Sequence, residues 1–171
     1  MPTIHTDAEL SPVLMAEKLA VEYKLQGFHC SEATLRACSQ AMGLQLSEDV
    51  LRCACGFRGG GGGYGDRCGI IEIGCMLISY LYGRLIPSQE TWQFSYLIRE
   101  LHTRFKEQFS SIYCRDIVPL ERAKGCKPVC LDTYRGGAKI LVQLLLDAPQ
   151  LLRDAPEAER QSGVRLTGPK D

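Results

Sequence analysis

Residues 56–67 contain seven glycines in twelve positions, and this run constrains the fold more than any other stretch of the chain. Glycine loses more backbone entropy on folding than other residues, so this segment is too costly to hold as a helix or strand. We expect a loop that divides two helical parts. Apolar residues on both sides recur at helical spacing, and no alternating run is long enough to support a sheet.

The pattern of caps and apolar stripes predicts an all-α, single-domain bundle of about five to six helices, with the glycine-rich loop before a central buried helix. We expect residues 1–10 to be a flexible leader, residues 11–150 to form the cysteine-rich helical domain, and residues 151–171 to be a mobile tail with little to bury. The expected helices cover residues 12–25, 29–42, 48–55, 68–82, 88–109 and 130–146, with a short piece at 114–118 that Pro119 stops.

Composition excludes several classes of protein. The chain has 171 residues, of which 45% are hydrophobic, so it can bury an ordinary core. Twenty basic residues balance twenty acidic ones, which argues against nucleic acid as a partner. The longest apolar stretch, residues 69–82, is shorter than the roughly 20 residues that cross a bilayer. The first residues lack the features of a secretion signal, so we expect a cytoplasmic protein without a membrane span.

Nine cysteines are many for such a protein. Cytosolic thiols are normally reduced, so the count favours metal binding or catalysis over structural disulfides, although a free cysteine is often a packing residue. Cys38 and Cys75 fall on internal helix faces and are expected to be packing residues. The short motifs are weak evidence, because neither C-x-C, at Cys53 and Cys55, nor C-x-x-x-C, starting at Cys126, has the spacing of a zinc ribbon.

Four cysteines fall where helices are expected to begin. Cys30, Cys68 and Cys130 lie in the first turns of three helices, and Cys114 begins the short piece. Free amide protons and the helix dipole stabilise a thiolate, which is both nucleophile and metal ligand. An iron-sulfur cluster bound by thiolates is negatively charged, so converging helix N-termini would suit it. These four cysteines are the predicted metal ligands.

The glycine-rich loop is the second part of the predicted site. Gly59, Gly60 and Gly61 have no side chains, so their backbone could approach a cluster or an anion closely, although a plain surface loop is the alternative. No strand precedes the loop and no Gly-Lys-Ser/Thr follows it, which excludes a nucleotide site. His29 and Glu72 could each lie beside the site or simply at the surface.

Several segments together resemble the redox-active protein family named for its C_GCAxxG_C_C pattern. They are residues 27–33 (GFHCSEA), residues 56–61 (GFRGGG) leading to Cys68, the Cys114 segment (CRDI) and Cys130. The resemblance implies a helical, redox-linked protein of bacteria or archaea that could bind an iron-sulfur cluster, with a domain similar to the N-terminal part of split-Soret cytochromes c. It assigns the family's four cysteines to these same positions.

This chain departs from the family pattern directly after Cys68. The pattern has Cys-Gly-Ala-x-x-Gly, whereas residues 68–74 read CGIIEIG, with bulky side chains in place of small ones and the second glycine one place late. Close packing around the site is therefore in question. The sequence has no C-x-x-C-H, so attached haem is excluded.

Three functions follow as hypotheses. The first is a redox-active protein that carries a cysteine-ligated iron-sulfur or similar metal centre for electron transfer or redox sensing, with an unidentified redox partner protein and a shared site in a homodimer as an option. The second is a thiol-disulfide protein in which Cys68 is the attacking, catalytic thiolate. The third is a non-enzymatic helical binding module with structural zinc or buried thiols.

Overall fold

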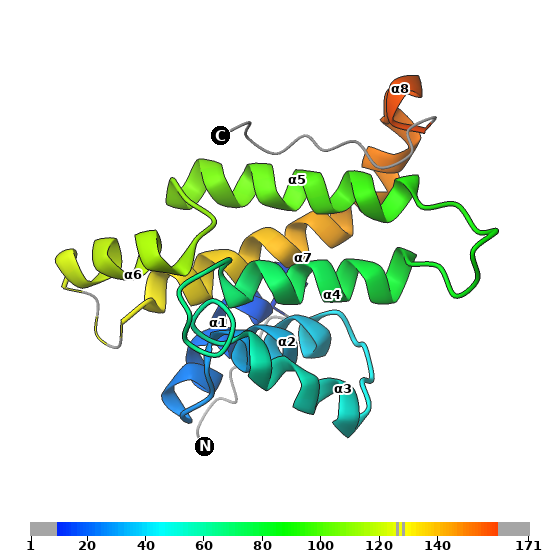
Figure 1. Ribbon diagram of the computed structural model, residues 1–171. Coiled ribbons are helices and arrows are strands. Elements are labelled where there is room, and N and C mark those ends of the chain that lie inside the picture. Colours follow the sequence, from blue (N-terminus) through cyan, green and yellow to red (C-terminus); the bar gives the residue numbers. More distant parts are fainter. Residues whose placement is uncertain (1–9, 126, 128, 161–171) are drawn as a thin grey trace, which may run out of the picture.

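The computed structural model describes residues 10–125, 127 and 129–160. Within these residues the chain forms eight α-helices and one short 3₁₀ helix, without a β-strand, which confirms the all-α prediction (Figure 1). The elements are α1 (Pro12–Leu25), α2 (Cys30–Ala41), α3 (Glu48–Cys53), η1 (Ala54–Phe57), α4 (Gly69–Tyr82), α5 (Trp92–Phe109), α6 (Cys114–Ala123), α7 (Leu131–Asp154) and α8 (Glu157–Arg160).

Two serine caps begin helices where the sequence predicts them. The side-chain oxygen of Ser11 accepts a hydrogen bond from the backbone N–H of Leu14, and Ser47 accepts one from Val50 in the same way. Each satisfies one of the amide protons that a helix start leaves without a partner. Pro12 at the first position of α1 costs nothing there, since its missing N–H would have no helical partner.

Helix α7 organises the packing. It contacts α1, α2, α4 and α5. Helices α4 and α5 also run side by side and contact each other (Figure 1). Leu35 of α2, Phe105 of α5 and Leu141 of α7 are fully buried in the shared core. The helix after the glycine-rich loop, α4, buries Ile70 and Ile71 in that core, as expected for a buried helix.

Some helix ends differ from the prediction. Helix α5 begins at Trp92 rather than at residue 88, and α6 runs through Pro119 to Ala123. Helix α7 continues through Pro149 to Asp154, beyond the predicted end at residue 146. A proline inside a helix removes one backbone hydrogen bond but does not have to end the helix when tertiary packing holds the flanking turns.

The helical part also extends past the domain boundary predicted at residue 150. Helix α8 packs against α5, where Arg99 and Glu159 form an ion pair. Ala155, between α7 and α8, is buried. The remainder of the predicted tail, residues 161–171, and of the predicted leader, residues 1–9, lies outside the described residues.

The glycine-rich loop is folded back on itself. Backbone N–H groups of Gly62 and Gly65 donate hydrogen bonds to the carbonyls of Gly56 and Gly59, both at 2.9 Å. Gly60 has a φ of 72°, and a Cβ there would lie 2.5 Å from the backbone nitrogen of Asp66. The coil therefore needs glycine both for its left-handed backbone and for the close approach of its two ends.

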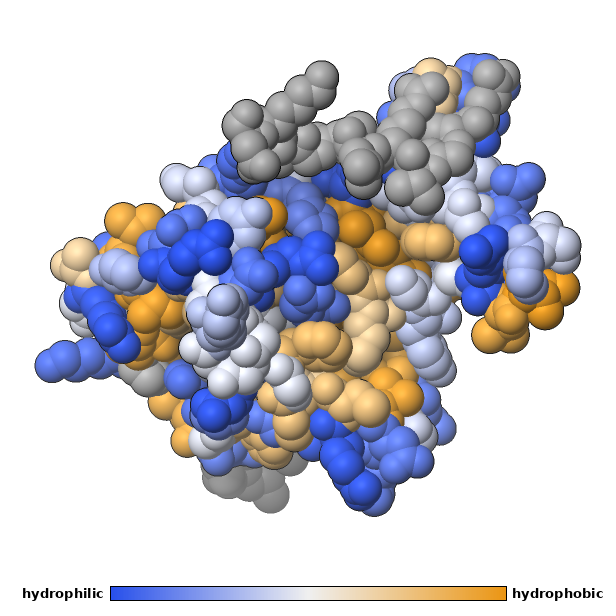
Figure 2. Space-filling model, viewed as in Figure 1, coloured by the Kyte–Doolittle hydropathy of each residue, from blue (hydrophilic) through white to orange (hydrophobic). Residues whose placement is uncertain are grey.

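The described part of the chain contains no helix that combines the length and apolar character needed to cross a membrane. Two neighbouring apolar side chains are exposed in the connection between α4 and α5, where Leu85 is 95% exposed and Ile86 is 55% exposed. The tip of this connection projects from the bundle as an apolar group (right side of Figures 1 and 2).

Candidate thiol site

Each of the four predicted ligands stands at a helix start. Cys30 and Cys114 are the first residues of α2 and α6, and Cys68 and Cys130 are the N-cap residues of α4 and α7. Cys130 also adopts a left-handed backbone with a φ of 67°. This conformation is uncommon for a residue with a Cβ and costs roughly 1–2 kcal/mol, so the surrounding structure must hold it in place.

A short antiparallel pairing brings two of these helix starts together. Arg67 and Tyr113 form an isolated β-bridge. The N–H of Cys68 donates to the carbonyl of Ile112, and the N–H of Cys114 donates to the carbonyl of Asp66, both at 2.8 Å. Residues two apart on an extended strand share a face, so Cys68 and Cys114 project to the same side of this pairing.

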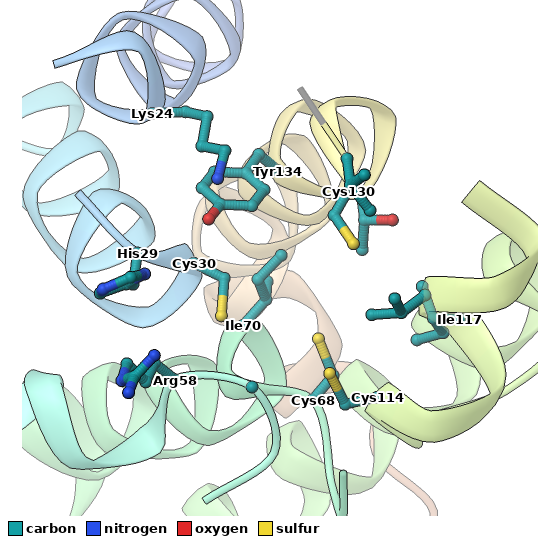
Figure 3. A pocket seen from close by; sticks show the side chains of 14 residues that line it. Lys24, His29, Cys30, Arg58, Cys68, Ile70, Cys114, Ile117, Cys130 and Tyr134 are labelled. Carbon is teal, nitrogen blue, oxygen red and sulfur yellow. The ribbon is translucent and has the colours of Figure 1, made fainter. Parts of the chain in front are cut away.

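All four cysteines line one cavity of about 180 Å³ (Figure 3). Their thiols surround this space from the ends of four helices rather than meeting at one point. Within residues 10–125, 127 and 129–160, no three His, Cys, Asp or Glu side chains form a group that could hold a metal ion.

Burial raises the pKa of three of the four thiols, those of Cys68, Cys114 and Cys130. Cys68 is 5% exposed, and its burial, followed by the charge of Cys30, raises its pKa far above the usual value. Burial raises the pKa of Cys130 to about 12 and also raises that of Cys114. The helix-start argument predicted stabilised thiolates, but desolvation of the charged form outweighs the helix termini. A buried thiolate here needs a positive charge inside the cavity, such as a metal ion.

One glycine next to the site is required by close packing. A Cβ at Gly69 would lie 2.5 Å from the carbonyl oxygen of Phe57 and 3.1 Å from the sulfur of Cys30. Helix α4 therefore begins in contact with both η1 and the start of α2. The small residue directly after Cys68 allows Cys30 to approach the start of α4.

The three glycines predicted to contact a cofactor are divided between two hollows. Gly59 lines the thiol cavity. Gly60 and Gly61 line a second hollow on the other side of the loop, together with Arg67 and Glu72.

The two residues that the sequence left undecided have different surroundings. His29 lines the thiol cavity and is the N-cap residue of α2. Glu72 accepts two hydrogen bonds from Arg67, at 2.7 and 3.1 Å, and Arg67 also contacts the ring of His102. Glu72 thus anchors the residue before Cys68 from the side opposite the cavity.

The other described cysteines lie apart from the cavity. Cys38 is fully buried in the core, as predicted for a packing residue, and Cys75 is half-buried against that core. Cys53 and Cys55 are exposed, and the thiol of Cys55 donates to the carboxylate of Glu32 at 3.2 Å. Cys126 lies outside the described residues.

The structure adds residues to the site that the sequence did not single out. Tyr134 lies one turn after Cys130, is 3% exposed, and points its hydroxyl group into the cavity (Figure 3). Lys24 lies over its ring, 4.9 Å from the centroid. Thr133 also lines the cavity, and its buried hydroxyl has no hydrogen-bond partner in the described part of the chain. The position of Tyr134 four residues after Cys130 was the one signal in the sequence that could have identified it as a site residue.

The fold and the site together define a class of protein, in which an all-helical chain places four thiols around one cavity. The model of the family described as "Putative redox-active protein (C_GCAxxG_C_C)" matches residues 28–144, so the chain belongs to that family. The matched region contains all four cavity cysteines and the glycine-rich loop. Comparisons with curated proteins and with solved structures gave no match.

Proposed function

We propose that the protein exchanges electrons through an iron-sulfur centre held by Cys30, Cys68, Cys114 and Cys130. The observation that carries the proposal is the convergence of four helix-start thiols on one cavity. Four cysteine thiolates are the usual ligand set of [2Fe–2S] and [4Fe–4S] clusters. Such a group supplies one-electron chemistry when it is bound.

The local electrostatics support a group that combines metal ions with a net negative charge. Burial raises the pKa values of Cys68, Cys114 and Cys130, so a bound cation is needed to hold these thiols as thiolates. The positive ends of the helix dipoles then face the net negative charge of the thiolate-bound cluster. The open space between the thiols suits a centre of several ions, each bound by a different sulfur, better than a single tetrahedral zinc.

The test is iron and acid-labile sulfide analysis with an absorption spectrum, on protein purified and reconstituted without oxygen. We expect a coloured protein with iron and sulfide in equal amounts and a spectrum that bleaches on reduction. Zinc without sulfide would replace the proposal with a structural metal site. A colourless protein without bound metal would reject both.

A reversible disulfide is the second candidate, and the pairing of residues 65–68 with residues 112–115 favours Cys68 and Cys114 as its partners. Oxidation would remove two electrons and two protons from the two thiols and form one S–S bond. Mass spectrometry of metal-free protein after mild oxidation should then show a loss of two hydrogens that a reductant reverses. Unchanged mass, or a disulfide between other cysteines, would reject this candidate.

We also expect the protein to work in a reducing compartment such as the cytoplasm, because the eight described cysteines are all free thiols. A separate redox partner protein is expected at one end of this electron exchange.

A further inference from the structure

The mouth of the thiol cavity has two chemically different sides. Lys24, His29 and Arg58 line one side, from the end of α1, the start of α2 and the start of the glycine-rich loop. Ile117, Val118 and Val129 line the other side. In Figure 3 Lys24, His29 and Arg58 all lie across the cavity from Ile117, with His29 and Arg58 near each other and Lys24 apart from them beside Tyr134. The described residues that line the cavity include no Asp or Glu.

The basic side chains of the mouth keep their charge available. Among the described residues, neither Lys24 nor Arg58 forms an ion pair with a carboxylate, and Arg58 is exposed. The ammonium group of Lys24 lies over the ring of Tyr134, 4.9 Å from its centroid, in the lining of the cavity. This local excess of positive charge stands out in a chain with no net charge.

Three acidic residues, Glu32, Glu121 and Asp66, interact with residues other than Lys24 and Arg58. Glu32 accepts hydrogen bonds from the backbone N–H of His29 and from the thiol of Cys55. Glu121 is buried near Cys130 and pairs with Lys124 at 3.3 Å. Asp66 pairs with Arg115 at 3.5 Å. None of the three forms an ion pair with Lys24 or Arg58, and Glu32 keeps its negative charge because both of its donors are neutral groups.

We propose that the reactant that exchanges electrons at this site is a small organic anion, whose negative group enters between Lys24 and Arg58 while its apolar body lies against Ile117 and Val118. This inference rests on the proposed function, because it names the substrate class of the same site. A channel lined by one sign of charge with low-dielectric walls raises the local concentration of oppositely charged ligands and speeds their arrival by tenfold or more. A cationic reactant is excluded by the same field.

The test compares an anionic and a neutral aromatic disulfide as probes of the metal-free, reduced full chain. The dianion 5,5′-dithiobis(2-nitrobenzoate) and neutral 4,4′-dithiodipyridine react in the same way. The Cys30 thiolate attacks one sulfur, a mixed disulfide forms, and the second aryl thiolate leaves with the electron pair. Cys53 and Cys55, which are the exposed cysteines among the described residues, are first replaced by Ser, and labelling of Cys30 is followed by peptide mass spectrometry.

The measured quantity is the ratio of the anionic to the neutral labelling rate at Cys30. We expect Lys24→Gln combined with Arg58→Gln to lower this ratio at least about threefold, and added salt to lower it in the unsubstituted chain. The control, Lys106→Gln combined with Lys139→Gln, removes two exposed charges that do not line the cavity and should leave the ratio unchanged. A neutral-probe rate equal in all three proteins shows that the cavity is intact.

Equal ratios in the two double variants, together with a ratio that salt does not change, would overturn the inference. This outcome is independent of the iron and sulfide analysis. A protein that binds a cluster but shows no charge selection retains the proposed function and loses only the inference. A protein that never binds a cluster but selects anions loses the proposed centre and keeps the anionic reactant.

Discussion

A Cβ atom at Gly137 would lie only 2.6 Å from Cγ2 of Ile70, so α7 has a glycine where α4 presents a β-branched side chain. Ile70 is 2% exposed and lines the thiol cavity. It stands where the family pattern has a small residue after Cys-Gly. The bulky residue is thus accommodated by a missing side chain on the neighbouring helix, and the packing around the cavity stays close.

This contact predicts the effect of Gly137→Ala. Alanine normally favours a helix over glycine by about 1 kcal/mol, but here the new methyl group would overlap Ile70. We expect a net loss of about 1–3 kcal/mol in the free energy of unfolding, measured by urea titration. In a double-mutant cycle, Ile70→Ala should offset part of that loss. Additive effects of the two substitutions would show that the contact does not couple them.

Gly69→Ala should disturb the site directly. The added methyl group would meet the carbonyl of Phe57 and the sulfur of Cys30, so Cys30 must move away from the start of α4. We expect the iron content after anaerobic reconstitution to fall at least about tenfold, since small displacements of site residues have effects of this size. The matched control is Gly74→Ala in the same helix, where the neighbour is the Leu101 side chain. It should lower stability but keep iron, and equal iron loss in both variants would contradict the account.

The rate at which half-buried Cys75 is alkylated should depend steeply on pH. Burial raises the pKa of Cys75 to about 11, and only the thiolate reacts with iodoacetamide. Labelling of Cys75 should be slow at pH 8 and should rise about tenfold per pH unit up to pH 10, because the thiolate fraction rises in this way below the pKa. Peptide mass spectrometry reads the rate, with exposed Cys53 as the internal reference. A Cys75 rate that levels off near pH 8 would refute the effect of burial.

The sequence was sufficient for the helical class and for the position of the four cysteines at helix starts, for identifiable reasons. Helix starts carry local signals, such as Ser11 before Pro12, and the cysteines stand at such starts. The helix ends predicted at Pro119 and at residue 146 were wrong, because a backbone hydrogen bond lost at a proline is weighed against tertiary contacts that the sequence does not display.

The residues that line the cavity, apart from the cysteines, were harder to predict from the sequence. Lys24 and Arg58 lie at the end of a helix and at the start of a loop, where no periodic pattern marks a functional residue. The direction of the pKa shift at Cys68 was also predicted wrongly, since the helix start is local whereas burial depends on the packing of the whole bundle.

The central claim, that four thiols hold one common centre, is tested most directly by serine substitution. Cys30, Cys68, Cys114 and Cys130 are replaced one at a time, with Cys53→Ser and Cys75→Ser as controls, and iron and labile sulfide are measured after anaerobic reconstitution. The account predicts at least about a tenfold loss in each of the four variants and full content in both controls. Full iron content in the four variants, or equal losses in the controls, would contradict it.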